Sequence, residues 1–505
     1  MVADVVVVGG GGSGLAAAIE AASLGREVVL LEKNHELGGT TAKSIGSISA
    51  SATPHQIRKG IKDSPREHFE DMPKFHDKLA ERPDNQALRR ILTENLPETF
   101  RWLMSMGVEF MGPMPEPPHR KMRMHNVLPN SQAYIYHLER SARRIGVAIH
   151  TDVRARRLLR DGERVVGVLC STKAGGDREF LARGGVVLAS GDYAGSPELK
   201  AKYISEALAR IEAINPTSTG DGQVMAMELG ARILNGDLSH YGIRFLPPSR
   251  RSLVQLLPPS RLLMRLANLF LEHLPAALIR PFIMSFLTTV LVPSPKLFRE
   301  GSVLVNKCGE LIEAEEKALA LPDQPDQIAY IVLDGATAKK FSAWPHYIST
   351  APGIAYAYMA DYRRKRRDIF HEAQSLALLA LKIGAPPATF EESIVRYRER
   401  LRRESRATGK SAPPPLETPP FYALGPVKAF VNFTDGGLAV NEDLQVLNSE
   451  SQPIPGLFAA GSTGQGGVIL DGHGHHLGWA FTSGRIAGRN AAFLVTSEDA
   501  AQAPA

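Results

Sequence analysis

Cysteine is almost missing from this chain of 505 residues, which contains only Cys170 and Cys308. Two cysteines cannot supply a disulfide framework or a cysteine-based metal or cluster site. No C-x-x-C-H haem-attachment motif occurs. This usage fits a reducing compartment, and we expect a cytoplasmic protein.

Long apolar runs are missing as well. Within the region 244–299, the longest uncharged stretch, 281–295, is too short and too rich in proline to span a bilayer. The first residues lack a basic segment, so we expect no signal peptide. Hydrophobic residues make up 44% of the chain and charged residues 22%, which is typical of a globular protein with more than one domain.

The chain carries no large excess of one charge, because its formal net charge is only +6. The densest basic run, 363–367, is interpreted as a solvated helix face, with an anionic partner or a membrane surface as the alternative. No aromatic interleaving or nucleic-acid reader motif accompanies this run. We therefore expect no nucleic-acid partner.

Glycine is concentrated at the start of the chain, in the segment 4–32, DVVVVGGGGSGLAAAIEAASLGREVVLLE. An apolar strand leads into a glycine turn, a helix of small residues and a second strand that ends at Glu32. Gly9 permits the tight turn, Gly11 lets the backbone approach a pyrophosphate, and Gly14 lets the helix pack on the strands. The helix N-terminus offers amides to phosphates, and Glu32 can accept hydrogen bonds from a ribose. The segment predicts a dinucleotide site.

A second glycine-rich constellation lies near the end of the chain. A buried strand, 457–461, runs into a glycine loop, and we expect a helix from Leu477 onward. His473, His475 and His476 stand directly before that helix. Histidines in a glycine loop have little core to pack in, so a role in acid–base chemistry is favoured over a structural one.

Between these ends, residues 244–299 are rich in Leu, Pro, Phe and Arg. Three interpretations remain open: a buried part of a second domain, a lid over an apolar pocket, or a segment that contacts a membrane surface through 250–298. The last two are compatible.

Six segments across the chain carry a family resemblance. They are VVVVGGGGSGLAAAIEAASLGREVVLLEK, GGTTAKSIGS, GGVVLASGDY, STGDGQVMAMELGA, DGGLAVNEDLQVLNSESQPIPGLFAAG and HLGWAFTSGRIAG. In this order the chain resembles the FAD-dependent fumarate reductase/succinate dehydrogenase flavoprotein superfamily, and within it the 3-ketosteroid dehydrogenase-like branch.

The resemblance implies an α/β and α+β architecture. A Rossmann-like FAD-binding domain, with a parallel sheet and a β-meander, would contain an inserted substrate-capping domain. The expected boundaries are 1–236 for the first part of the FAD-binding domain, 237–430 for the capping domain and 431–505 for the second part.

The resemblance also implies where FAD would bind. Covalent attachment is not expected, since no histidine lies between Gly38 and Ser51, where some relatives tether the flavin. The last helix would point at the flavin and stabilise negative charge there. The implied cofactor-binding residues are Gly9, Gly11, Gly12, Ser13, Gly14, Glu32, Lys33, Gly39, Thr40, Thr41, Ser44, Gly46, Val153, Ser190, Gly191, Asp221, Gly461 and Gly478.

Departures from the family pattern concern the substrate end. Asn432 and His475 or His476 stand where fumarate-type enzymes place a histidine and an arginine for a dicarboxylate. Leu470 stands where ketosteroid dehydrogenases place a tyrosine, and Gly474 matches the glycine whose amide holds the carbonyl. The candidate catalytic residues are His473, His475, His476, Gly474, Tyr347 and Tyr358, although for each of the two tyrosines an ordinary half-buried aromatic is the favoured interpretation.

We expect no metal site, because only Asp471 accompanies the three histidines.

The expected activity is dehydrogenation of a ketone, or reduction of an enone, at a CH–CH bond next to a carbonyl. The expected substrate is bulky and apolar, steroid- or terpenoid-like, and an external electron acceptor or donor would complete the cycle. One alternative is a fumarate- or urocanate-like reductase of a small unsaturated carboxylate, and another is a peripheral membrane protein with structural FAD.

Overall fold

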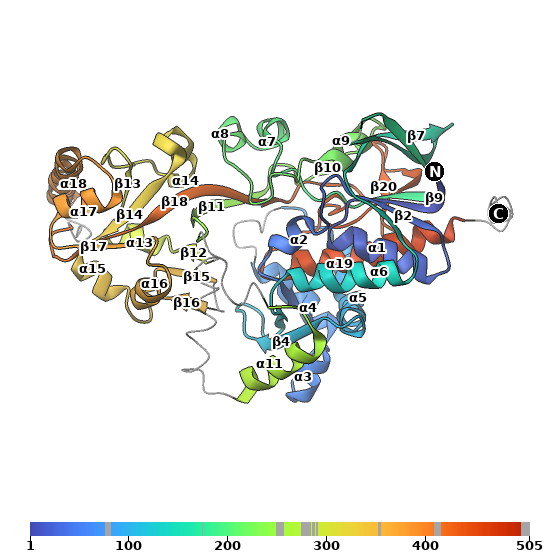
Figure 1. Cartoon of the computed structure of the whole chain (residues 1–505), viewed down its shortest axis with the longest axis horizontal. Helices are drawn as coiled ribbons and strands as arrows, with labels where there is room; N and C mark the ends of the chain where they lie inside the picture. The colour runs from blue at the N-terminus through green and yellow to red at the C-terminus, as the bar shows by residue number, and fades with distance from the viewer. Residues whose placement is uncertain are drawn as a thin grey trace.

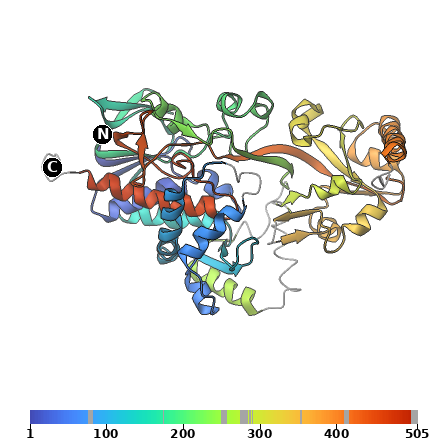
Figure 2. The ribbon, with the colours of Figure 1, turned by 180° about the vertical axis from the view of Figure 1, so that it is seen from behind.

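The computed structural model describes residues 1–75, 82–173, 175–248, 257–273, 284, 288, 291–351, 355–408 and 416–495. Figure 1 shows two lobes that are joined by the long strands β11 (Ser239–Phe245) and β18 (Phe421–Thr434). Figure 2 shows the same arrangement from behind. Both ends of the chain lie at the lobe that holds the larger sheet.

The larger sheet has eight strands in the order β20-β21-β9-β1-β2-β6, with β7 and β8 added beside β9. Val5 pairs with Val28 on one side and with Gly185 on the other, and both pairings are parallel. The mixed α/β fold with a parallel sheet and an antiparallel β-meander is confirmed. The strands are β1 (Val2–Val8), β2 (Val28–Leu31), β6 (Ala148–His150), β7 (Val153–Asp161), β8 (Arg164–Thr172), β9 (Asp177–Leu188), β20 (Gln445–Leu447) and β21 (Pro453–Ala459).

Small residues let the first and last helices pack closely. A Cβ atom added at Gly484 would lie 2.3 Å from the backbone oxygen of Ser13, and one at Gly488 would lie 2.1 Å from that of Ala17. Any larger side chain at either glycine would push the two helices apart. These helices are α1 (Gly12–Ser23) and α19 (His475–Phe493), and α6 (Gln132–Arg144) lies beside α1.

The second lobe is built on a five-stranded antiparallel sheet in the order β11-β18-β14-β13, with β17 also paired to β18. His240 on β11 lies opposite Phe433 on β18. The domain boundaries 236/237 and 430/431 stay a prediction. Further elements here are β13 (Val303–Asn306), β14 (Ala329–Leu333), β17 (Phe370–Ala373), α13 (Lys296–Arg299), α14 (Lys317–Ala320), α15 (Gly335–Lys340), α16 (Met359–Lys365), α17 (Leu376–Ile383) and α18 (Pro387–Thr408), with β12 (Val292–Pro293), β15 (Ser349–Ala351) and β16 (Ala355–Ala357) in a small separate sheet.

A third group of elements lies below the larger sheet in Figure 1. Within this group, the strands β4 and β5 pair with each other and bury Phe110 and Met124. The elements are α3 (Pro54–Arg58), α4 (Pro65–Asp71), α5 (Gln86–Ser105), α11 (Arg261–His273), β3 (Ser47–Ser49), β4 (Glu109–Met114) and β5 (Met124–Leu128). Shorter connecting elements are α2 (Gly39–Lys43), α7 (Pro197–Tyr203), α8 (Glu206–Ala209), α9 (Asp221–Met227), β10 (Ile233–Leu234) and β19 (Gly437–Leu438).

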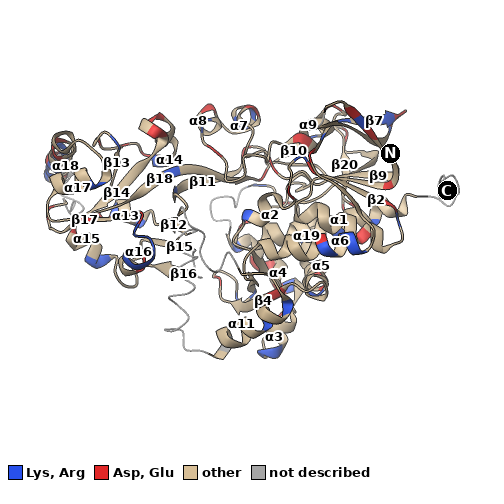
Figure 3. Cartoon of the chain, in the orientation of Figure 1, with Lys and Arg blue, Asp and Glu red and all other residues tan. Residues whose placement is uncertain are grey.

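Figure 3 shows the basic run 363–367 as blue ribbon at the end of α16. Four of its members are exposed, as expected for a solvated face, but Arg366 is buried. Its guanidinium donates to the backbone oxygens of Thr288 and Leu246 and pairs with Asp368. Arg366 therefore serves the packing of the second lobe.

Among the described residues, none of the helices combines the length and the apolar character that crossing a membrane requires. Of the segment 250–298, residues 250–256, 274–283, 285–287, 289 and 290 lie outside the described part.

Candidate active site

A cavity of about 600 Å³ runs from the turn between β1 and α1 to the loop before α19. Its first end is formed by backbone and small side chains of the larger lobe. Its far end adds residues of β11, β12 and β18 from the second lobe. The cavity is therefore built by segments far apart in the sequence, and its volume is that of a pocket for an extended small molecule.

The glycine turn shapes the first end. Gly9 has φ +112°, and a Cβ there would lie 2.3 Å from the oxygen of Ala189. Gly11 caps α1 without a side-chain hydrogen bond, and a Cβ there would meet nothing closer than the Gly38 oxygen, at 3.9 Å. The start of α1 thus presents bare backbone to the cavity, which is the arrangement that binds phosphate groups.

Glu32 lies beside this turn and is buried. Its Oε2 accepts a hydrogen bond from the Gly10 amide at 2.8 Å, and its Oε1 accepts one from the Asn34 amide at 2.8 Å. The carboxylate therefore fixes both loops around the cavity and still lines it.

Lys33 and Asp221 form an ion pair at the same end, with 2.9 Å between Nζ and Oδ2. Arg154 also pairs with Asp221. Burial alone would raise the pKa of the Asp221 carboxyl, but the hydrogen bonds and charges of Arg154 and Lys33 lower it below its usual value. The positive charge of Lys33 is thus already balanced.

The middle of the cavity is lined by short side chains. Thr40 accepts a hydrogen bond from the side chain of Asn215, and Ser190 accepts one from the Gly222 amide. Gly39 has φ +51° and lies over Gly11, where a Cβ would approach the Gly11 Cα to 3.6 Å. Together, the bare helix start, the glycine cradle and the length of the cavity fit FAD. The residues that would hold it are those of the predicted set that line the cavity.

Two histidines share one buried carboxylate at the far end. Nε2 of His240 donates to Oδ2 of Asp435 at 3.1 Å, and Nε2 of His476 donates to Oδ1 at 2.8 Å. Both rings contact Phe433, with ring centroids 4.4 Å and 4.3 Å away. His240 and His476 line the cavity, while Asp435 stands behind them.

This arrangement determines which of these side chains carry a charge. Burial alone would raise the pKa of the Asp435 carboxyl, but its hydrogen bonds to His240 and His476 hold it well below the usual range. Burial alone would lower the pKa of His240, but the hydrogen bond and charge of Asp435, together with Asp471 at 3.4 Å, raise it. His240 is therefore favoured as the cation.

His473 lines the cavity beside this group. Its amide and its Nδ1 both bond to Oε1 of the buried Glu116, at 2.8 Å and 2.6 Å. Gly474 follows with φ +91°, and a Cβ there would lie 2.5 Å from the Ser49 amide nitrogen. The glycine is required where α19 begins, because no side chain fits between the helix start and β3.

The structure brings most of the predicted residues to the cavity wall. Six predicted residues lie elsewhere. Gly14, Gly461 and Gly478 face neighbouring packed segments, since an added Cβ would meet Gly9, Ser13 and Leu96 respectively. The other three do not line the cavity either: His475 is buried beneath it, Tyr347 stacks with Trp344 and Tyr356 in the second lobe, and Tyr358 precedes α16. Those that line it are Gly9, Gly11, Gly12, Ser13, Glu32, Lys33, Gly39, Thr40, Thr41, Ser44, Gly46, Val153, Ser190, Gly191, Asp221, His473, Gly474 and His476.

Sequence reasoning missed His240 and Arg244, which line the far end together. They are four residues apart on β11, so they lie on the same face of the strand. No motif surrounds either residue. The only available signal was the onset of the arginine-rich segment at Arg244.

Comparisons with known proteins agree with this geometry. A family model described as "FAD binding domain" matches residues 4–269 and 273–472. Urocanate reductase of Eggerthella lenta is 27% identical, and the match covers 97% of this chain and 75% of that protein. A fumarate reductase (cytochrome) of Shewanella frigidimarina is 25% identical over 97% of this chain and 77% of that protein.

Solved structures show the same fold. The open conformation of a flavocytochrome c3 fumarate reductase has a TM-score of 0.71 at 25% identity, covering 98% of this chain and 78% of that one. A 3-ketosteroid-Δ4-(5α)-dehydrogenase from Rhodococcus jostii RHA1 has a TM-score of 0.58 at 23% identity, covering 97% of both chains. The chain belongs to the FAD-binding-domain family that its sequence matches, and it is an FAD-dependent oxidoreductase.

Proposed function

We propose that this FAD-dependent CH–CH oxidoreductase reduces the C=C bond of an α,β-unsaturated carboxylate that carries an apolar body. The observation that carries the proposal is the His240–Asp435–His476 group at the far end of the cavity. It holds a protonated imidazole where a substrate would lie. Reduction of such a bond needs a proton donor, so a stabilised imidazolium favours the reductive direction.

Arg244 is proposed to anchor the carboxylate. Burial lowers the pKa of its guanidinium, yet arginine stays charged at neutral pH. It lies on the same strand face as His240. A carboxylate held by Arg244 would place the adjacent carbon near His240, and a guanidinium suits a carboxylate because it can donate two parallel hydrogen bonds.

His240 is proposed to deliver the proton. Its Nε2 hydrogen is held by Asp435, so the proton to be transferred is the one on Nδ1. After transfer the neutral ring keeps its Nε2 bond to Asp435 and its contact with Phe433, and is ready to be protonated again. Asp435 and Asp471 make the cation stable enough to exist at neutral pH.

FAD, when bound, supplies the hydride that the reduction needs. The chain's own part is to bind and orient. The glycine turn and the start of α1 hold the cofactor at one end, and Gly474 leaves the first amides of α19 facing the other end. Leu291, Pro293 and Phe433 form an apolar wall that excludes water and receives the body of the substrate.

The relatives support an unsaturated carboxylate. Urocanate and fumarate, from which the two relatives above take their names, are both unsaturated carboxylates.

A second candidate is the bulky apolar ketone or enone expected from the sequence. The apolar residues at the mouth of the cavity, Leu291, Pro293 and Pro295, favour it. In that case Arg244 or the Gly474 amide would hold a neutral carbonyl oxygen, and the same His240 would handle the proton.

The test is a panel assay on the FAD-loaded protein, reduced without oxygen. Its flavin absorbance is followed after addition of urocanate, cinnamate-like acids, fumarate, steroid enones or terpenoid enones. Reoxidation by apolar carboxylates, lost in Arg244→Met, supports the proposal. Reoxidation only by enones, unchanged in Arg244→Met, favours the second candidate. Reoxidation by none of the compounds contradicts both.

A further inference from the structure

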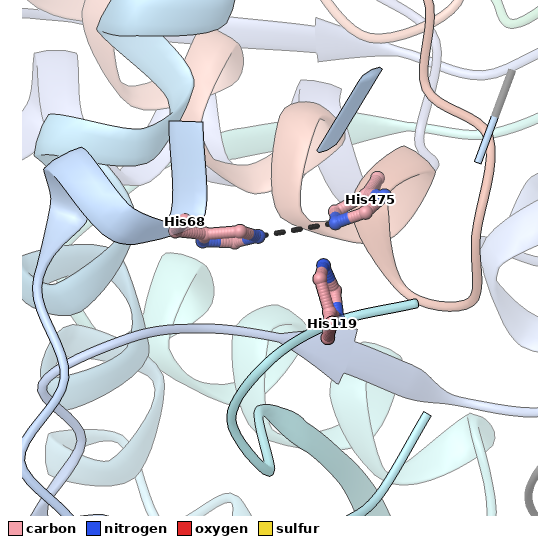
Figure 4. A group of neighbouring side chains, drawn as sticks. All are labelled: His68, His119 and His475. Carbon is pink, nitrogen blue, oxygen red and sulfur yellow. Dashed lines mark hydrogen bonds between the residues drawn. The ribbon is translucent and has the colours of Figure 1, made fainter. Parts of the chain in front are cut away.

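Three histidines from distant segments meet beneath the cavity (Figure 4). His68 comes from α4, His119 from the segment between β4 and β5, and His475 from the first turn of α19. All three are buried, and one nitrogen of each lies within 4.8 Å of the others. The sequence predicts no metal site here, because His68 and His119 join His475 only in the folded chain.

The hydrogen bonds within this cluster leave ring nitrogens of His68 and His119 without a partner. Nδ1 of His475 lies 2.5 Å from the backbone oxygen of Asp471, so it carries the hydrogen and Nε2 carries a lone pair. Nε2 of His68, 3.1 Å away, must then donate to it, which leaves Nδ1 of His68 buried without a partner.

His119 poses the sharper problem. It is 8% exposed, and neither of its ring nitrogens has a hydrogen-bond partner. A neutral imidazole carries one N–H and one lone-pair nitrogen, so this ring buries both an unsatisfied donor and an unsatisfied acceptor. Figure 4 shows its nitrogen-bearing edge turned toward the gap between His68 and His475.

We propose that His68, His119 and His475 bind one divalent transition-metal ion of the zinc type. Imidazole nitrogens are preferred ligands of such ions, and three histidines form a known kind of zinc site. Two nitrogens bonded to a tetrahedral zinc ion lie about 3.3 Å apart, and the His68 and His475 nitrogens are already 3.1 Å apart. The ion replaces the His68–His475 hydrogen bond: the proton of His68 moves from Nε2 to Nδ1, the Nε2 lone pairs of His68 and His475 bind the ion, and one nitrogen of His119 adds a third lone pair.

The surroundings suit such an ion. The Nδ1–H of His475 on the Asp471 oxygen is the outer contact that orients a metal-binding histidine. Phe75 packs on His119 and His475, with ring centroids 4.7 Å and 5.8 Å away. The nearby Arg123 does not oppose the ion with an unbalanced charge, because Asp63 and Asp71 both pair with it.

Neutral imidazole is the form that binds metal. Burial, with the neighbouring histidines and Arg123, lowers the pKa of His68 well below its usual value and that of His119 to about 2. Both rings are therefore neutral at physiological pH.

The ion would connect α4, the segment between β4 and β5, and the start of α19, beside the loop 471–474 that lines the cavity. His475 stands between Gly474 and His476, which line the cavity, and it does not line the cavity itself. Metal binding at His475 would fix the start of α19 and thereby the positions of His473 and His476. The three histidines are positioning residues in this proposal, and the ion takes no part in the reaction.

The test uses the untagged, FAD-loaded chain of 505 residues, stripped with a chelator and titrated with Co²⁺ and then Zn²⁺. We expect one ion per chain, the visible absorption of four-coordinate Co²⁺, its loss on addition of Zn²⁺, and a higher melting temperature with either ion. Absence of saturable binding in the wild-type protein overturns the proposal, and leaves the proposed reductase activity untouched.

The variants His68→Asn and His119→Asn locate the site. Each should weaken Zn²⁺ binding by more than about tenfold. His150→Asn is the matched control, because His150 also has an unpartnered ring nitrogen but lies on β6, outside the cluster. Binding that survives in both cluster variants overturns the proposal even if the wild-type protein binds the ion.

Discussion

Nε2 of His240 lies 3.1 Å from Oδ2 of Asp435 and joins the segment that follows β18 to the neighbouring strand β11. His240 belongs to β11, whereas Asp435 directly follows β18 and also bonds His476 at the start of α19. The proposed proton donor and the loop at the cofactor end are thus held by a single buried carboxylate.

Asp435→Asn should move the pH dependence of substrate reduction. In the wild-type protein the pKa of His240 is raised, so the active cation is present below that pKa and is lost as the pH rises through it. Without the carboxylate the alkaline fall in kcat/KM should shift to lower pH by about one unit or more. The measurement is a pH profile of reduced-flavin reoxidation. The exposed Asp443→Asn should leave the profile unchanged, and an unshifted profile in Asp435→Asn contradicts this role.

His240→Gln should lower turnover by about 10²- to 10⁴-fold, which is the usual contribution of a general acid. Glutamine can still bond Asp435, so the fold and FAD content should be retained. Anaerobic stopped-flow reoxidation separates the proton-transfer step from cofactor binding. If His240→Gln turns over at the wild-type rate while His476→Gln does not, the proton donor is His476.

The first end of the site could be predicted from the sequence because its function is carried by backbone. The strand, glycine turn, helix and Glu32 are consecutive, so the local pattern contains the whole device. The parallel register of Val5 with Val28 follows from it.

The far end could not be predicted in the same way. His240, Asp435 and His476 come from three separate segments: the pairing of β11 with β18 brings His240 to Asp435, and the start of α19 adds His476. For His475 the sequence-based prediction of a catalytic role was misleading. Its place in a glycine loop suggested catalysis, but its ring turns into the protein toward His68. Which side of the loop a side chain faces depends on packing that no short motif specifies.

Asp71→Asn should destabilise the protein by about 3 kcal/mol at neutral pH, because it breaks a buried ion pair with Arg123. Burial alone would raise the pKa of the Asp71 carboxyl, but bonds from Lys74, Arg123 and Arg120 hold it well below its usual range. Its stabilisation is therefore present above the unfolded pKa of about 3.9 and fades as the pH falls toward the folded value.

Urea unfolding at neutral and acidic pH checks this prediction. The gap between wild-type protein and Asp71→Asn should narrow below about pH 4. Glu70→Gln is the control, because Glu70 is exposed and pairs with Arg66 and Arg120 at the surface. A gap that is the same at both pH values contradicts the assignment.

Contact with a membrane surface through 250–298 stays a prediction, and α11 offers a way to test it. Arg265 and Asn268 bond to β4, while Leu262, Leu266 and Phe270 are 72%, 47% and 61% exposed on the helix. Wild-type protein should float with anionic liposomes, and the triple change of these three residues to serine should abolish flotation. The control changes exposed Leu378 and Leu381, which lie on α17. Wild-type protein that never floats contradicts the prediction.

Gly11→Ala should separate cofactor binding from folding. Gly11 has φ −80°, which alanine adopts without strain. The added methyl group would enter the cavity where the pyrophosphate of the cofactor is expected to lie. The dissociation constant for FAD should rise at least about tenfold, equivalent to about 1.4 kcal/mol, with the melting temperature of the FAD-free protein unchanged. Gly14→Ala should behave differently, because its Cβ would lie 1.8 Å from the Gly9 oxygen and would disturb the packing of α1 on β1. Gly242→Ala, where an added Cβ meets nothing within 4 Å, is the control, and equal FAD affinity in Gly11→Ala and Gly242→Ala would place the pyrophosphate elsewhere.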